Sequence, residues 1–336
     1  MSSPTEEPLR RITSVATGLV LVAGSLAFAA PAHAAVATKV TIRTDHAPSY
    51  IGDEVTVSGK LTRSSGTALK GQPILLNIAG KRKIVNTNSD GLYIAEFTVP
   101  KSGAFTAEFL GSDSYTESTA ATAYYAIQYR TFIDGFSATP RPIEQNKPLS
   151  ITGHTNRVAA TGNQRLPGAG LDLLFSGDGA NWSYVSSTTS DGSGRFRFTP
   201  IVGQDGTWKV VLKPNIVADG WLQSERGVWV DSRYKTSVSA SVTPKNVRYK
   251  GKVKVYGTLK HKADGVWSVF GGVRVAVYHR DKGSKKWRFQ GWISVGGNGK
   301  FSKKFTVKRD GYWKVTFNGN GANFRDSSDS KYVNVR

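Results

Sequence analysis

The stretch Ser89–Gly111, SDGLYIAEFTVPKSGAFTAEFLG, decides the fold, because its pattern occurs twice more in the chain. The other copies are SDGSGRFRFTPIVGQDGTWKVVLKP, at positions 190–214, and NGKFSKKFTVKRDGYWKVTFNG, at positions 298–319. Each copy contains a Phe-Thr pair, then a glycine and, two residues later, an aromatic residue. Apolar and polar residues alternate from there, which is the period-two pattern of a half-buried β-strand.

The repeat extends in both directions from this stretch. Upstream, two alternating aliphatic residues precede Gly59, Gly153 and Gly257, which lie 94 and 104 residues apart. Two further features recur in all three copies. One is an additional strand, and the other is an aromatic residue that lies three positions before a serine. The strand is predicted at Ile74–Ile78, Leu171–Phe175 and Val273–Val277, and the pairs are Tyr115/Ser118, Trp221/Ser224 and Phe324/Ser327. One module of ~100 residues therefore occurs three times.

Each module is predicted to be an antiparallel β-sandwich. Short alternating strands are separated by Gly, Asp, Asn and Pro, and long stretches with helical periodicity are absent after the N-terminal segment. The predicted fold class is all-β, with three tandem sandwiches at residues 35–127, 128–236 and 237–336. The SDG, Phe-Thr, DG-aromatic and aromatic-x-x-Ser motifs resemble bacterial extracellular immunoglobulin-like domains. That family includes adhesins, stalks and binding modules, so the resemblance implies the fold and leaves the function open.

The first 34 residues have the features of a secretory signal peptide. Arg10 and Arg11 precede an apolar run that ends in APAHA, which predicts cleavage between Ala34 and Ala35. An uncleaved membrane anchor is the alternative, but the run is shorter than the ~20 residues that span a bilayer. We therefore expect a secreted protein with no transmembrane segment in its mature chain. The chain has no cysteine, so core burial alone must hold each module together.

The net charge of +21 is concentrated in the third module. Residues 236–336 carry 22 Lys and Arg against 5 Asp and Glu, whereas residues 35–127 carry 9 against 8 and residues 128–235 carry 12 against 9. A solvated face that keeps the protein soluble is one explanation. Self-repulsion makes such a concentration of charge costly, so an anionic partner is the other. Lysine outnumbers arginine here, which favours diffuse charge attraction over bidentate recognition.

Strand parity predicts where these charges lie. If Val253, Val255 and Leu259 face inward, the intervening lysines share the outer face of one sheet with those of the strand that contains Phe305. Lys303 breaks this parity, which a β-bulge would explain. A hairpin at His279–Arg288 adds further cations. The predicted polyanion-binding residues are Lys250, Lys252, Lys254, Lys260, Lys304, Lys308, Arg280, Lys282, Lys285, Lys286 and Arg288.

Eight tryptophans lie in the last two modules. Trp208 and Trp313 are repeat positions and are predicted to be core residues. Trp182 and Trp287 occupy matching sites at which side chains are expected to be half-exposed. The candidates for stacking on a sugar ring are Trp267, Trp287 and Trp292, and ordinary hairpin packing is the alternative.

The sequence contains no recognisable catalytic or metal-binding pattern. Its five histidines lack metal-ligand spacing, and neither a nucleophile motif nor a phosphate-binding loop is present. The pairs Asp90-Gly91, Asp191-Gly192, Asp205-Gly206 and Asp310-Gly311 are predicted hairpin turns rather than calcium ligands. We expect no enzyme activity, no cofactor and no metal.

The sequence favours a secreted, monomeric, non-enzymatic binding or adhesion protein. Its third module would attach to an anionic cell-envelope or matrix polymer, such as a wall polymer or an acidic polysaccharide. Nucleic acid would be bound only without sequence specificity. A carbohydrate-binding protein that uses exposed tryptophans, and a purely structural spacer, are the alternatives.

Overall fold

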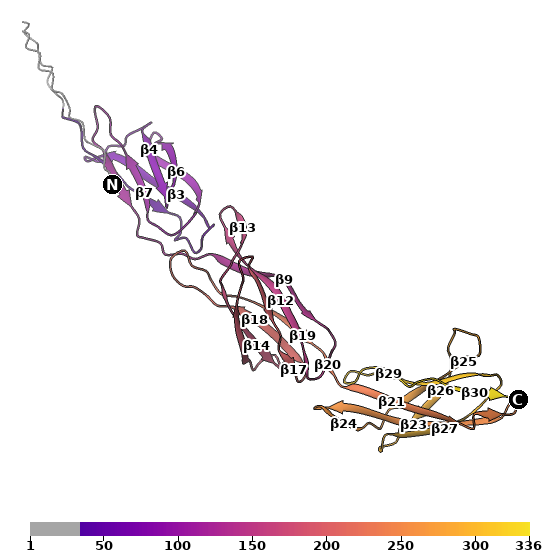
Figure 1. Ribbon diagram of the computed structural model, residues 1–336. Coiled ribbons are helices and arrows are strands. Elements are labelled where there is room, and N and C mark those ends of the chain that lie inside the picture. Colours follow the sequence, from indigo (N-terminus) through magenta and orange to yellow (C-terminus); the bar gives the residue numbers. More distant parts are fainter. Residues whose placement is uncertain (1–33) are drawn as a thin grey trace, which may run out of the picture.

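The computed structural model describes residues 34–336 as three β-sandwiches that follow one another along an elongated chain (Figure 1). No helix occurs in this part of the chain, and each sandwich is built from sheets whose strands are antiparallel apart from two short parallel pairings, which confirms the predicted all-β immunoglobulin-like fold. The predicted signal peptide falls almost wholly on residues 1–33, which lie outside the described residues. The module boundaries at 127/128 and 236/237 stay a proposal.

The first sandwich packs two four-stranded sheets against each other. One sheet has β3 at its centre, paired with β1, β2 and β6, and the other has the order β5-β4-β7-β8. The strands are β1 (Thr38–Val40), β2 (Arg43–Thr44), β3 (Glu54–Arg63), β4 (Pro73–Ile78), β5 (Lys81–Asn86), β6 (Leu92–Thr98), β7 (Phe105–Phe109) and β8 (Ser118–Ala121).

The second sandwich repeats this plan with additional short pairings. Strand β12 pairs with β9, β13 and β16, and the facing sheet has the order β15-β14-β18-β19. The strands are β9 (Arg130–Thr139), β10 (Ile143–Glu144), β11 (Lys147–Pro148), β12 (Ser150–Ala159), β13 (Gly162–Arg165), β14 (Gly170–Ser176), β15 (Ser183–Thr189), β16 (Arg195–Phe198), β17 (Ile201–Val202), β18 (Gly206–Leu212), β19 (Ser224–Val230) and β20 (Ser232–Arg233).

The third sandwich has β23 at the centre of its first sheet, paired with β21, β24 and β27. Its second sheet has the order β22-β30-β28-β25-β26, with β29 on β28. The strands are β21 (Lys235–Thr243), β22 (Asn246–Val247), β23 (Lys252–Ala263), β24 (Val266–Val269), β25 (Arg274–Asp281), β26 (Arg288–Ser294), β27 (Lys300–Thr306), β28 (Gly311–Phe317), β29 (Asp326–Ser327) and β30 (Lys331–Val335).

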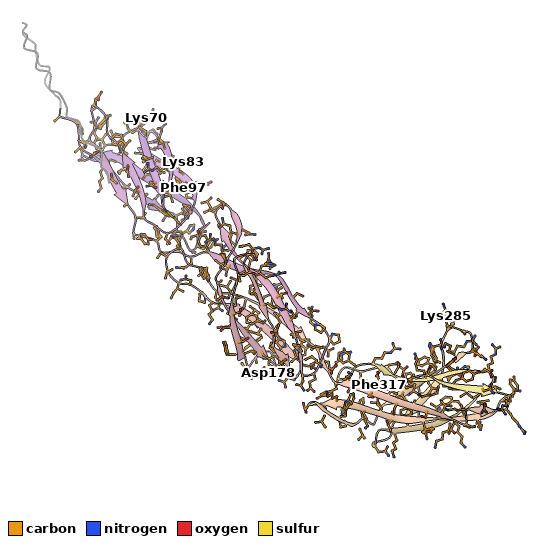
Figure 2. All side chains as sticks on the ribbon, in the orientation of Figure 1. Lys70, Lys83, Phe97, Asp178, Lys285 and Phe317 are labelled. Carbon is orange, nitrogen blue, oxygen red and sulfur yellow. The ribbon has the colours of Figure 1, made fainter. Side chains whose placement is uncertain are left out.

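Each sandwich encloses its own hydrophobic core. Phe105, Trp208 and Trp313 are buried at the same place in β7, β18 and β28, as the repeat predicts. Figure 2 labels Phe97 and Phe317, which belong to the first and third cores. Burying each large side chain stabilises a sandwich by about 1.5–3 kcal/mol. Because the chain has no cysteine, this burial holds each sandwich together without a disulfide.

An aromatic ring over a glycine fixes the register of the two central strands in every first sheet. Gly59 pairs with Tyr93, and Gly153 pairs with Phe196 in the next copy. In the third copy Gly257 pairs with Phe301, and a Cβ at this glycine would collide with the Phe301 ring and with the carbonyl of Ser239. Only glycine leaves room for the ring on one side and the neighbouring strand on the other.

Two of the predicted Asp-Gly turns are wrong. Gly206 and Gly311 are the first residues of β18 and β28, and neither adopts a left-handed conformation. Their aspartates hold the edges of the sandwiches together, because Asp205 accepts a hydrogen bond from the Ser232 amide and Asp310 accepts one from the amide of Val335, both at 2.6 Å. The glycine is needed because the ring of the neighbouring core residue occupies the space of a Cβ.

The predicted alignment of the third copy is shifted in two places. The residue opposite Trp313 is His279, at the position that Phe175 occupies opposite Trp208, so the strand lies two residues later than expected. Asn323 takes the place of Trp221, because Asn323 bridges to Tyr234 as Trp221 bridges to Tyr129. Both errors arose because a polar residue fills an aromatic position.

The junctions between sandwiches are short and tied by specific contacts. At the first junction, the Asp219 carboxylate accepts a hydrogen bond from the Ser102 amide at 2.7 Å. The Arg130 guanidinium lies 4.0 Å from the centre of the Tyr50 ring. At the second junction, the Asp264 amide donates a hydrogen bond to the Gln145 side chain at 3.0 Å.

Replacing Gly257 with alanine is expected to destabilise the third sandwich by about 1–3 kcal/mol or more, because the added methyl group overpacks the contact between Phe301 and β21. Hydrogen exchange of the β23 and β27 amides in the full protein measures this locally. Gly297→Ala is the matched control, since nothing lies within 4 Å of its Cβ position. Equal protection in the two variants would contradict the role of the ring contact.

Acid is expected to weaken the third sandwich through His279. Burial lowers the pKa of His279 from its ordinary 6.5, and the nearby Asp281 carboxylate opposes this only in part. The unfolded chain therefore binds a proton more readily than the folded one, so stability falls as the pH drops below about 6.5. His279→Phe, which copies Phe175, should flatten this dependence in hydrogen exchange of the β25 and β28 amides. An unchanged pH dependence would exclude His279 as the cause.

Candidate polyanion interface

Outward-facing lysines on β23 and β27 form a basic surface on the first sheet of the third sandwich. We call this surface the lysine face. Val253, Val255 and Leu259 are fully buried, so the residues between them point away from the core, as the parity predicts. The lysine face consists of Lys252, Lys254, Lys260, Lys262, Lys300 and Lys304.

The strand register places like charges directly opposite each other. Lys254 of β23 faces Lys304 of β27, and Lys262 of β23 faces Lys235 of β21. Directly opposed side chains have Cβ atoms only about 4.5–5.5 Å apart, and like charges in that position are destabilising. The lysine face is therefore a feature that the fold tolerates at a cost in stability.

The structure contains no bulge at Lys303, contrary to the prediction. The pairing of β23 with β27 is continuous, and Lys303 lies opposite the buried Val255. Its side chain is exposed nevertheless, and its ammonium donates a hydrogen bond to the Trp292 carbonyl at 3.2 Å. Strand β27 is an edge strand, and an inward-pointing lysine discourages pairing with another chain at such an edge.

Two predicted site residues lie beside the lysine face rather than on its strands. Lys250 precedes β23 in a turn with a φ of 60°, and its ammonium lies 5.4 Å from the centre of the Tyr249 ring. Lys308 follows the end of β27 and is exposed. The parity argument extended the strand two residues too far at Lys250, because the tight turn at Gly251 was not foreseen.

The remaining predicted cations belong to the second sheet. Lys282, Lys285 and Lys286 lie on the connection between β25 and β26, and Lys285 marks the protruding end of this hairpin in Figure 2. Arg288 is exposed at the start of β26. The structure thus divides the predicted set between two sheets. Arg280 differs from all of these, because its guanidinium lies between two aromatic rings.

No ion pair among residues 34–336 involves a lysine of the lysine face. The only ion pair of the third sandwich among these residues joins the Asp281 carboxylate to the Arg309 guanidinium at 3.4 Å, and the same carboxylate lies 3.4 Å from the ring of His279. In the second sandwich, by contrast, the Asp134 carboxylate lies 2.8 Å from the Arg165 guanidinium on the corresponding sheet and neutralises its charge. The charge of the lysine face is therefore available to a partner.

The first sandwich carries opposite charges at the same positions. Counting from the register glycine, Glu54 corresponds to Lys252 and Glu96 corresponds to Lys304. All four side chains occupy the outer face of the sheet, so the same backbone presents either sign of charge. The basic surface is therefore a property of the third copy and not of the fold.

The tryptophans are not equally accessible. Trp267 and Trp292 are 43% and 41% exposed, whereas Trp182 and Trp287 are half-buried. The most exposed tryptophan, Trp229 at 54%, was missed by the sequence reasoning. Its position next to the buried Val230 in an alternating strand was the available signal.

Within residues 34–336, no cluster of three or more His, Asp or Glu is arranged to hold a metal ion. The same residues include no helix long and apolar enough to cross a membrane.

Comparison with known proteins gave matches to solved structures only. No protein-family model and no curated protein matches the chain. Domains A168–A170 of titin share 11% identity with a TM-score of 0.41, and cover 89% of this chain and all of theirs. The Escherichia coli adhesin FdeC shares 17% identity with a TM-score of 0.31, over 89% of this chain and 96% of its own. A bacterial ice-binding adhesin shares 14% identity with a TM-score of 0.28, and the match covers 90% of this chain and 98% of the adhesin chain. Similarities this distant carry no information about a ligand.

Proposed function

We propose that this protein is an exported, non-enzymatic binding protein whose lysine face attaches it to an anionic polymer of the cell envelope or extracellular matrix. The observation that carries the proposal is the reversal of charge between Glu54 and Glu96 of the first copy and Lys252 and Lys304 of the third. The first two sandwiches would act as a spacer or contact a second partner.

The cost of the lysine face supports a ligand over simple solubility. Solubility requires net charge but not two lysines in direct opposition, and Lys254 and Lys304 are placed in that way. A polymer that carries closely spaced negative charges would lie between them and remove their repulsion. Lys254, Tyr256 and Lys300 line a hollow that is open to solvent, and a surface of this kind suits an extended polymer better than an enclosed small molecule.

The kind of charge indicates diffuse recognition. The cations of the lysine face are all lysines, and an ammonium acts as a point charge without the fixed geometry of a guanidinium. Binding to such a surface is dominated by electrostatic attraction, which salt screens over about 8 Å at physiological ionic strength. The hairpin cations Lys282, Lys285 and Lys286 would extend the contact around the end of the sandwich.

The alternatives make different predictions. A carbohydrate-binding protein that uses the exposed Trp267 would bind in a salt-insensitive manner and lose binding when that ring is removed. A structural spacer would bind no polymer. Measuring polymer binding over a salt series distinguishes both alternatives from the proposed function.

Exchanging the two matched lysines for the residues of the first copy is expected to abolish binding. In Lys252→Glu/Lys304→Glu, the fold is preserved because glutamates already occupy these positions in the first sandwich. Binding to purified cell walls and to polyphosphate is measured by co-sedimentation and calorimetry over a salt series. The wild type should bind less as salt rises, and the variant should not bind detectably.

The matched control is Lys70→Glu/Lys81→Glu, which changes the net charge equally but on exposed positions of the first sandwich. It should retain most of the binding. The proposal fails if the two double variants lose binding equally, or if wild-type binding is indifferent to salt.

The third sandwich is expected to gain stability when one of the two opposed lysines is replaced with glutamate. Lys304→Glu replaces a like-charge pair with an opposite-charge pair across β23 and β27, which should stabilise the sandwich by about 0.2–1 kcal/mol at low salt. Hydrogen exchange of the β27 amides measures the change. The gain should shrink at high salt, and a loss of protection would show that the lysines stabilise the fold.

A further inference from the structure

The second sheet of the third sandwich presents a cationic cluster of a different kind on its outer face. The Trp287 ring has two cations against it: the Lys314 ammonium at 4.5 Å and the Arg280 guanidinium at 5.1 Å from the ring centre. Arg280 also lies 4.9 Å from the centre of the Tyr312 ring. These rings hold the two cations in place without neutralising them. We call these four residues the Trp287 cluster.

The second sandwich contains the same arrangement with one addition. Trp182 corresponds to Trp287, and the Lys209 ammonium lies 4.1 Å from its ring centre. Lys209 and Lys314 both follow the core tryptophan of their strand. In the second sandwich, however, the Glu225 carboxylate lies 3.2 Å from the Lys209 ammonium. In the second sandwich the charge of Lys209 is therefore already neutralised by a carboxylate of the same chain.

The third sandwich lacks this carboxylate. Glu225 of β19 faces Val211 of β18, and the residue at the same register in the third copy is Ser327, which faces Thr316. The acidic groups closest in sequence to the cluster have other partners. Asp281 pairs with Arg309, and Asp310 accepts hydrogen bonds from the Val335 amide and the Tyr332 hydroxyl.

The surroundings of Lys314 show what the cluster lacks. Partial burial, followed by the charges of Arg325 and Arg280, lowers the pKa of Lys314. The Arg280 Nε is buried and has no hydrogen-bond acceptor within the described residues. An anion beside these cations would relieve their mutual repulsion.

Aromatic rings extend from the cluster along the same face. Lys314 of β28, Tyr278 of β25 and Phe289 of β26 lie side by side in register across three strands. Phe289 is 50% exposed and lies edge-to-face with Trp292, with 5.4 Å between ring centres. Neighbouring strands are about 4.8 Å apart, so the exposed rings lie about 10 Å from the Lys314 backbone.

We propose that this face binds a carboxylated sugar of an acidic polysaccharide. Lys314 and Arg280 would hold the carboxylate, which would take the role toward Lys314 that Glu225 has toward Lys209 in the second sandwich, and Phe289 and Trp292 would stack on the sugar rings. A carboxylate is the anion that the matched site of the second sandwich already accommodates. This site is separate from the lysine face, which lies on the other sheet beside the exposed Tyr256 of β23 and Trp267 of β24.

The experiment introduces a carboxylate into the third sandwich at the position that corresponds to Glu225. Ser327→Glu places a glutamate at the position of Glu225, so that it competes with the ligand for Lys314. Oligogalacturonate binding to the full protein at physiological salt should weaken about ten-fold or more, the value of one charged hydrogen-bonded contact. Ser327→Gln, of equal size and no charge, should bind as the wild type does, and Lys314→Gln should weaken binding as Ser327→Glu does.

Further arms separate this site from the lysine face. Carboxyl-reduced oligogalacturonate should not bind, and Ser327→Glu should leave polyphosphate binding unchanged. Equal affinities of Ser327→Glu and Ser327→Gln would overturn the inference, as would binding of the reduced sugar. If Lys252→Glu/Lys304→Glu alone abolishes oligogalacturonate binding, the sugar sits on the lysine face, so this inference falls while the proposed function stands. Loss of polyphosphate binding in Ser327→Glu would identify a general anion site instead.

Discussion

The contact between an aromatic ring and a glycine is the constraint on which the rest of each sandwich depends. It recurs at Gly59/Tyr93, Gly153/Phe196 and Gly257/Phe301. A slip of one residue would place the ring against a side chain and move every core residue to the solvent. The contact therefore fixes which residues of two strands face outward. In a chain without cysteine, the identity of the outer surface rests on this packing together with the alternation of apolar and polar residues.

This constraint leaves the outer surface free to change without changing the fold. The same register presents Glu54 and Glu96 in the first copy and Lys252 and Lys304 in the third. Outward side chains contribute little to the core, so their exchange costs only the interactions among themselves. Three sandwiches with similar cores but different surfaces can therefore have different roles. One copy can bind a partner, while the others act as a spacer.

The parts of this structure that followed from sequence are those governed by alternation. The buried Val253 and Val255, and the outward Lys252 and Lys254 between them, were predicted from period two alone. Prediction failed where a polar residue took an apolar position. His279 packs against Trp313 with 4.9 Å between ring centres, as Phe175 does against Trp208, yet it interrupts the apolar pattern that marks the strand. Contacts between distant strands, such as Arg280 with Tyr312, leave no trace in local periodicity.

The three copies form a graded series at the position after the core aromatic residue. The first copy has Thr106 there, with no tryptophan beside it, and the second has Lys209 with Trp182 and the carboxylate of Glu225. The third keeps the lysine and the ring, loses the carboxylate and gains Arg280. Each difference alone is a small change on an exposed face. Together they convert a satisfied ion pair into an unsatisfied one, and an unsatisfied, ring-held pair of cations is what a site for an external anion requires.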